Sequence, residues 1–233
     1  MSSGPAAAVH AARRTHVMNA MEGGVMLLAA APERVRTADL LYPFRQDSDF
    51  DYLTGFPEPE AVCLLAPGHE QPFTLFVQPE DKDRTIWVGA RHGVGGAQQR
   101  FGADAAFAIA DLETELPKRL AAAAHVYLQL GRDDAVSDRI HAIVRKVQRE
   151  RPRTGTGPTA LREANQILHE QRLHKAPDEI AALRDAIAIA GEAHREAMRT
   201  ARPGMLEYEL EAMLNFTFRR RGAAGPAYDS IVA

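Results

Sequence analysis

Two histidines in the second half of the chain invite comparison with a zinc site. His169 and His174 flank the residues Glu-Gln-Arg-Leu. The zinc-protease pattern places its two histidines four residues apart, so that both side chains lie on one face of a helix. A separation of five residues turns the second side chain by roughly 140° around the helix, against roughly 40° for a separation of four. The spacing therefore favours two solvent-exposed helix histidines over a shared metal ion.

The other residue types that could do chemistry are scattered or wrongly spaced. The glycines in residues 92–96 lack a third glycine at the spacing of a phosphate-binding loop, and the loop's lysine is missing, which favours a flexible turn. Cys63 lies within an apolar run, so we expect a buried strand residue rather than a nucleophile. The 9 histidines are dispersed, and no set of Asp, Glu and His has the spacing of a metal site. Spacing alone identifies no active site.

The most distinctive segment is residues 38–61, which read ADLLYPFRQDSDFDYLTGFPEPEA. Its aromatic residues, prolines and aspartates follow an order that fits neither a helix stripe nor a strand alternation. From the physical pattern alone we expect a packed loop between strands, with aspartate side chains capping its turns.

Residues 42–61 resemble a motif in the N-terminal domain of the Xaa-Pro aminopeptidases (aminopeptidase P). The family motif is Tyr-Pro-x-Arg-Gln-x-Ser-Asp-Phe-x-Tyr-Leu-Thr-Gly-Phe-x-Glu-Pro-Glu-Ala, and the segment matches it at every fixed position. One departure is Ala176, which stands where such proteins often carry a serine that caps the next helix. The resemblance covers nearly the whole chain, because it continues in residues 86–91, 169–180, 202–208 and 228–232.

The resemblance implies a fold and a division of the chain. Residues 1–175 would form an α/β N-terminal domain of the creatinase/aminopeptidase P type, with a mixed sheet and flanking helices. Residues 176–233 would form the first helices and first strand of a truncated α+β metallopeptidase domain of the pita-bread fold. In the family, the five metal ligands (two Asp, one His and two Glu) follow that strand. We therefore expect the chain to be catalytically incomplete as given and inactive alone.

The resemblance also implies an activity, which is release of the N-terminal residue from peptides with proline in second position. Hydrolysis in the family uses a pair of metal ions, usually manganese. Trp87 matches a family tryptophan that reaches toward a neighbouring subunit's substrate cleft, which implies a homo-oligomer. Tyr228 matches a tyrosine near the metal site, whose hydroxyl can support a ligand carboxylate. Trp87 could equally be a core residue, and Tyr228 could be a strand aromatic packed on a helix.

The first half of the chain shows the element pattern of an α/β domain. Apolar runs bounded by Gly, Pro or Asp predict buried strands at 25–31, 61–66, 73–78 and 125–130. Helices are expected at 6–21, 96–100, 111–123 and 133–149. Two prolines and two glycines in residues 151–158 predict a linker. Beyond it we expect helices at 159–175, 177–200 and 206–221, and a strand at 227–233.

Composition narrows the partners and the compartment. The 28 Lys and Arg residues against 31 Asp and Glu give a net charge of −3, which argues against a nucleic-acid surface. The apolar run near the N-terminus is too short for a signal peptide or a membrane span. The single cysteine excludes an intrachain disulfide and suits a reducing compartment. We expect a cytoplasmic protein.

Three functional hypotheses remain open at this point. The chain is part of an aminopeptidase P, or it is a non-catalytic binding or oligomerisation module built on the same N-terminal domain. A third possibility is one of the related prolidase or creatinase-like branches, although the motif at 42–61 favours aminopeptidase P.

Overall fold

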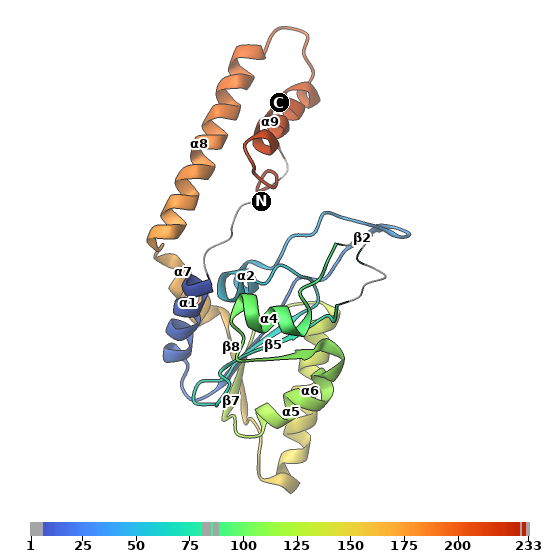
Figure 1. Cartoon of the computed structure of the whole chain (residues 1–233), viewed down its shortest axis with the longest axis vertical. Helices are drawn as coiled ribbons and strands as arrows, with labels where there is room; N and C mark the ends of the chain where they lie inside the picture. Colours follow the sequence, from blue (N-terminus) through green and yellow to red (C-terminus); the bar gives the residue numbers. More distant parts are fainter. Residues whose placement is uncertain (1–6, 81–84, 86–88, 229, 232–233) are drawn as a thin grey trace. The chain divides into compact units, whose positions relative to one another are not determined.

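The computed structural model describes residues 7–80, 85, 89–228 and 230–231. The chain divides into two compact units, Pro5–Leu173 and His174–Ala233. Figure 1 shows the elements of both units, which are described separately below. No helix in these described ranges is both long and apolar enough to cross a membrane.

The first unit is built on a six-stranded mixed sheet in the order β6-β5-β4-β1-β7-β8. Strands β1, β7 and β8 are mutually parallel, as are β5 and β6, whereas β4 is antiparallel to both of its neighbours. The four predicted strands are confirmed as β1, β4, β5 and β7. The strands are β1 (Val25–Ala29), β4 (Val62–Leu65), β5 (Phe73–Val77), β6 (Ala105–Ala108), β7 (His125–Leu128) and β8 (Ala160–Glu163).

Helices cover both faces of this sheet, because its central strands are apolar on both sides. Alternate residues of β1 show this: Met26 and Leu28 join the cluster beneath α1, α2, α4 and α7, whereas Leu27 joins the cluster beneath α5 and α6. The predicted fold class, a mixed sheet with flanking helices, is confirmed. The covering helices are α1 (Ala7–Ala20), α2 (Ser48–Thr54), α4 (Gly93–Phe101), α5 (Leu112–Leu120), α6 (Ala135–Thr154) and α7 (Asn165–Leu173), with a 3-10 turn at Ile109–Asp111.

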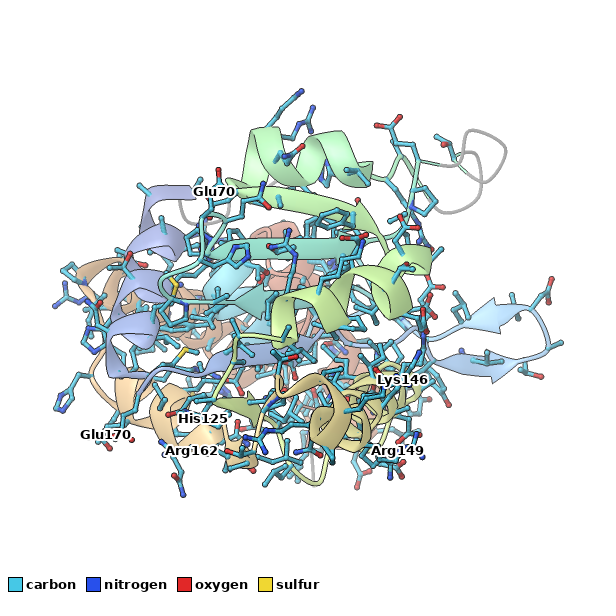
Figure 2. The ribbon with its side chains drawn as sticks, turned by 90° about the horizontal axis from the view of Figure 1, so that it is seen from below. Glu70, His125, Lys146, Arg149, Arg162 and Glu170 are labelled. Carbon is cyan, nitrogen blue, oxygen red and sulfur yellow. The ribbon has the colours of Figure 1, made fainter. Side chains whose placement is uncertain are left out.

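Residues 32–45 form an extended arm that carries the short strands β2 (Val35–Thr37) and β3 (Leu40–Leu41). Among the described residues, these two strands pair with each other and not with the six-stranded sheet. In Figure 2 they are the pale blue arrows that project beyond the rest of the unit. Several large apolar side chains on the arm are exposed, including Val35, Leu40 and Tyr42.

Some sequence predictions about elements in the first unit were wrong. Residues 38–61 are not all loop, because Ser48–Thr54 form helix α2. The helix expected at 159–175 begins only at Asn165, because Ala160–Glu163 pair with β7 instead. The linker expected at 151–158 begins later, because α6 continues through Pro152 to Thr154 and ends at Gly155 in the left-handed conformation (φ 72°). A proline in the last turn removes only one helical hydrogen bond, which an exposed helix end tolerates.

The second unit contains two helices, α8 (Pro177–Thr200) and α9 (Glu207–Arg220), within its described residues. Both predicted helices are confirmed. Glu192 of α8 pairs with Arg220 and Arg221 at 3.0 and 3.2 Å. The prediction of a strand at 227–233 was wrong for the residues that the structure describes there, because none of them has strand conformation. A strand needs a hydrogen-bonded neighbour, and the described part of this unit is helical.

Basic side chains of α1 fix the C-terminal end of α2. The Arg14 guanidinium donates to the Leu53 carbonyl oxygen at 2.8 Å and lies 3.8 Å from the centre of the Phe73 ring. His10 Nδ1 lies 3.0 Å from the Tyr52 carbonyl oxygen, and burial lowers the His10 pKa. The last carbonyl groups of a helix have no partner within the helix, so these contacts satisfy them. They join two elements about forty residues apart.

Two glycine-to-alanine substitutions are expected to change the free energy of unfolding in opposite directions. A Cβ at Gly24 would lie 2.8 Å from the His125 carbonyl oxygen, so we expect Gly24→Ala to lower the free energy of unfolding by more than about 2 kcal/mol. Gly95 lies exposed within α4 with nothing near its Cβ position, so Gly95→Ala should stabilise by about 0.5–1 kcal/mol. Urea unfolding of both variants measures this. Equal effects would contradict the proposed packing.

Candidate functional site

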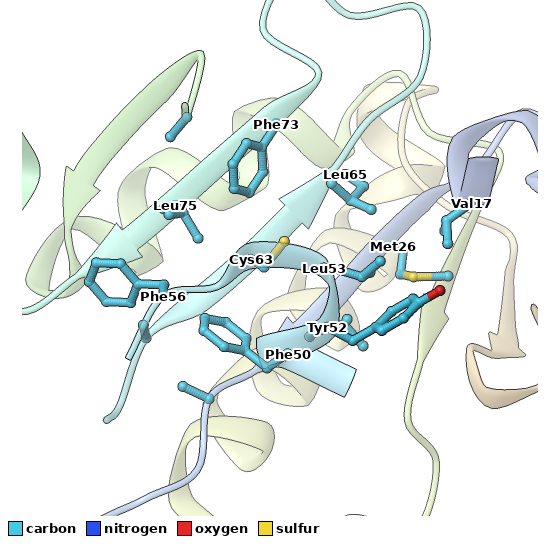
Figure 3. Packing of buried hydrophobic residues seen from close by; sticks show 14 of the residues in the cluster. Val17, Met26, Phe50, Tyr52, Leu53, Phe56, Cys63, Leu65, Phe73 and Leu75 are labelled. Atoms are coloured by element: carbon cyan, nitrogen blue, oxygen red, sulfur yellow. The ribbon is translucent and has the colours of Figure 1, made fainter. Parts of the chain in front are cut away.

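In residues 42–61, the family-like segment, polar residues near the start lie at the carboxyl ends of the parallel strands β1 and β7. Asp47 caps helix α2, because its carboxylate accepts from the backbone N–H groups of Asp49 and Phe50 at 3.0 and 2.9 Å. Gly55 ends the helix in the left-handed conformation (φ 62°). Figure 3 shows the apolar members of the segment, Phe50, Leu53 and Phe56, among the buried side chains around Cys63. The apolar side chains therefore anchor the segment, and polar groups at its start remain at the strand ends.

Arg132 joins four elements at these strand ends. Its guanidinium donates to the Ala30 carbonyl oxygen at 2.9 Å and to Gln129 Oε1 at 3.1 Å. It also pairs with Asp47 at 3.2 Å and with Asp134. Asp134 is the N-cap of α6, so one cation links the N-terminal caps of α2 and α6 to the ends of β1 and β7. The Arg132 side chain is only 16% exposed, which strengthens these charge-assisted contacts.

The Asp134 carboxyl is held in its charged form. Burial opposes ionisation, but the backbone N–H of Ser137 and the Arg132 guanidinium favour it, and together they lower the Asp134 pKa below its usual value. Its oxygens also accept from the Val136 N–H at 3.1 Å and the Ser137 hydroxyl at 3.0 Å. The carboxylate is thus committed to the cap and to Arg132.

Gln46 is a structural bridge and has no free hydrogen-bonding atom for a ligand. Its Oε1 accepts from the N–H groups of Ala31 and Asp47 at 2.8 and 2.9 Å. Its Nε2 donates to the carbonyl oxygens of Phe56 and Glu58 at 3.0 and 2.8 Å. One amide therefore links Asp47, Phe56 and Glu58 of this segment to Ala31, two residues after β1.

Asp49 forms a second buried charge cluster beside the first. Its carboxylate pairs with Arg172 of α7 and accepts from Gln129 Nε2 at 3.0 Å. His169 Nε2 lies 4.0 Å from the same carboxylate, and the His169 side chain is 65% exposed. The prediction of an exposed helix histidine is confirmed for His169, whereas His174 belongs to the second unit. Sequence reasoning did not identify the pairing of Asp49 with Arg172, because 123 residues separate them.

A cleft of about 730 Å³ opens over these groups, within the first unit. One wall is the arm, the other is the turn at residues 129–134, and Asn165 lies beyond the end of β8. Ligands of open α/β sheets bind outside the carboxyl ends of parallel strands, which is where this cleft lies. Its lining includes Arg34, Tyr42, Phe44, Arg45, Leu130 and Asp133.

The residues singled out from the sequence have different positions in the structure. Trp87 lies outside the described residues. Tyr228 is described and is 76% exposed. Cys63 is confirmed as a buried strand residue, and burial raises the pKa of its thiol to about 12. The glycines expected in a flexible turn at 92–96 instead lie in the first turns of α4.

The described ranges contain no group of three or more His, Cys, Asp or Glu side chains placed to hold a metal ion. The described residues therefore offer no set of ligands for a pair of metal ions.

Known families match both parts of the chain. The family model "Aminopeptidase P, N-terminal domain" matches residues 10–127, and the model "Metallopeptidase family M24" matches residues 181–233. The Xaa-Pro aminopeptidase of Escherichia coli is 37% identical over 223 residues, which are 94% of this chain and 51% of that protein. The Xaa-Pro aminopeptidase of Haemophilus influenzae is 35% identical, over 95% of this chain and 49% of that protein.

A solved structure agrees with these sequence matches. The aminopeptidase PepP of Pseudomonas aeruginosa superposes with a TM-score of 0.94 at 41% identity, over 100% of this chain and 53% of that chain. The chain thus spans about half the length of the curated relatives it matches.

Removing the Arg132 charge should destabilise the first unit. Because Arg132→Gln leaves two capping carboxylates without their shared cation, we expect the free energy of unfolding to fall by about 2–3 kcal/mol. The control is Arg139→Gln, which breaks the exposed pair with Glu113 and should cost less than about 1 kcal/mol. Urea unfolding followed by circular dichroism measures both. Similar small losses would show that Arg132 does not hold these elements together.

The Asp134 pKa predicts a dependence of stability on pH. A carboxyl whose pKa is lower in the folded protein stabilises the fold above its unfolded pKa, which is about 4, and loses that contribution as pH falls through the folded pKa. Asn can still cap the helix, so Asp134→Asn isolates the charge. We expect the variant to be less stable than wild type near pH 7 and the difference to shrink below about pH 4. A difference constant from pH 7 to pH 3 would contradict this; Asp138→Asn, in the same turn, is the control.

Proposed function

Because the chain belongs to the aminopeptidase P family, we propose that it contributes the N-terminal half of an enzyme that releases the N-terminal residue from peptides with proline in second position. The observation that carries this proposal is the match along the whole chain to proteins named Xaa-Pro aminopeptidase and aminopeptidase P. Peptides containing proline are the substrates of the whole protein in this proposal.

The proposal assigns residues 1–175 to the N-terminal domain and residues 176–233 to the beginning of the metallopeptidase domain. The two matched ranges, 10–127 and 181–233, support this assignment. So does the division of the chain into the units Pro5–Leu173 and His174–Ala233.

In this proposal the metal chemistry belongs to residues other than those described. A pair of metal ions, manganese in this proposal, would supply the hydroxide nucleophile and polarise the peptide carbonyl. The described residues hold no suitable ligand group, so the chain by itself should be inactive. Its own contribution is to place substrate-facing and supporting residues around that centre.

Two residues carry proposed supporting roles. Trp87 would face the substrate cleft of a neighbouring subunit, in a homo-oligomeric cytoplasmic enzyme. Tyr228 would hydrogen bond to a ligand carboxylate and so orient it. The large exposed surface of Tyr228 leaves its hydroxyl available for such a bond.

A chimera tests the proposal. Residues 1–233 are joined to the remaining C-terminal part of the E. coli Xaa-Pro aminopeptidase, and hydrolysis of an Xaa-Pro dipeptide is measured with manganese. We expect turnover by the chimera and none by residues 1–233 alone, because only the chimera can complete a two-metal site. Trp87→Ala should raise KM, and Tyr228→Phe should lower kcat by about tenfold to 100-fold, as supporting groups around metal sites do.

The control is the intact E. coli enzyme assayed in parallel. Metal binding and turnover by the 233-residue chain alone would contradict the proposal that the metal site is formed by other residues of the enzyme. A folded chimera that binds metal but does not cleave the dipeptide would instead favour a non-catalytic module, for which the large cleft of the first unit is the supporting feature.

A further inference from the structure

The cleft of the first unit contains a set of charges that are satisfied internally. The Arg132 cation is shared by Asp47 and Asp134, and both carboxylates also accept backbone N–H groups at helix N-termini. The partial positive charge of each helix N-terminus further compensates these carboxylates. This set therefore holds the cleft in shape and is not available to a ligand.

Three charged side chains of the lining remain without an oppositely charged partner among the described residues. Arg34 and Arg45 lie on the arm, and the Arg45 guanidinium donates a hydrogen bond to the Ser48 hydroxyl at 3.1 Å. Asp133 lies on the opposite wall, in the turn at 129–134. One wall is thus cationic and the other anionic.

Apolar surface lies between these charges. Tyr42, Phe44 and Leu130 all line the cleft and are all exposed. Scattered exposed apolar side chains need no explanation, but three that converge on one cleft are typical of a binding site. Asn165 Oδ1 accepts from Gln129 at 3.4 Å, and the described residues offer no acceptor to its Nδ2, which can therefore donate to a ligand carbonyl.

We propose that this cleft binds a short peptide with free termini. The peptide carboxylate would lie against Arg34 and Arg45, its ammonium group against Asp133, and its apolar side chains against Tyr42, Phe44 and Leu130. Opposite charges on facing walls select a zwitterion, because a ligand with one charge would leave the other wall unpaired. The cleft volume, about 730 Å³, lies within the range of small-ligand sites, roughly 300–1,000 Å³.

All the lining residues of this cleft belong to the first unit. The proposed site adds a peptide-binding role to the N-terminal domain itself. The inference does not depend on hydrolysis or on proline, so it can fail while the proposed function stands.

The test is a titration of the 233-residue chain with the tetrapeptide Ala-Leu-Ala-Phe, followed by NMR in the presence of EDTA. EDTA prevents hydrolysis by any adventitious metal. We expect saturable shifts at residues 31–48 and 129–134, and binding weaker by about threefold to fivefold for the C-terminally amidated and for the N-acetylated peptide. Each blocked peptide loses one of the two charge contacts.

Variants connect each peptide end to its wall. Arg45→Gln and Arg34→Gln should weaken binding of the free-acid peptide but not of the amidated one. Asp133→Asn should weaken binding of the free-amine peptide but not of the acetylated one. Arg149→Gln and Glu70→Gln are matched controls, because they remove the same charges at exposed positions outside the lining and should leave binding unchanged.

The inference is overturned by any of four results. The first is that no shifts occur at about 10 mM peptide, a concentration at which even very weak binding is detected. The second is that free and blocked peptides bind with equal affinity, and the third is that the control variants weaken binding as much as the wall variants do. The fourth is that the shifts are confined to other parts of the chain. Because all the substituted side chains are exposed, loss of folding is not expected, and a thermal unfolding curve for each variant checks it.

Discussion

The architecture of the first unit depends on one shared cation at the ends of its parallel strands. Arg132 reaches the carbonyl oxygen that follows β1, the side chain that follows β7, and the carboxylates that cap α2 and α6. Without this cation the Asp47 and Asp134 carboxylates would lie near each other as like charges. The cation therefore links the strand ends to both helix caps at the floor of the cleft.

Gln46 and Asp49 extend this constraint to the rest of the family-like segment. The side-chain amide of Gln46 makes four hydrogen bonds to backbone groups, two through Oε1 and two through Nε2. Asp49 links α2 to α7 through Arg172 and to the end of β7 through Gln129. The polar residues of the motif are thus mostly structural. Arg34, Arg45 and Asp133 have no oppositely charged partner among the described residues, and they lie on the cleft walls rather than inside the network.

The elements that sequence patterns predicted are those with the strongest local signal. Strands β1, β4, β5 and β7 are apolar on both faces, and α8 has a clear N-terminal proline followed by acidic residues. The missed strands lie at the sheet edges or in the arm. β6 reads Ala-Ala-Phe-Ala and β8 reads Ala-Leu-Arg-Glu, which are equally compatible with helix, and only pairing with β5 and β7 makes them strands. Helix α2, with 7 residues, is too short to show a helical period.

The sequence by itself determined the family, the mixed α/β class and the buried character of Cys63, because these follow from a long specific motif and from local apolar runs. It also placed the helices of the second unit, whose caps and apolar stripes are local. Only the tertiary structure decided which motif residues are structural, since Arg132, Asp47 and Asp134 are brought together from separate parts of the chain. The cleft was likewise beyond sequence reasoning, because its walls come from the arm and from a turn nearly 100 residues away, and no local pattern encodes how they face each other.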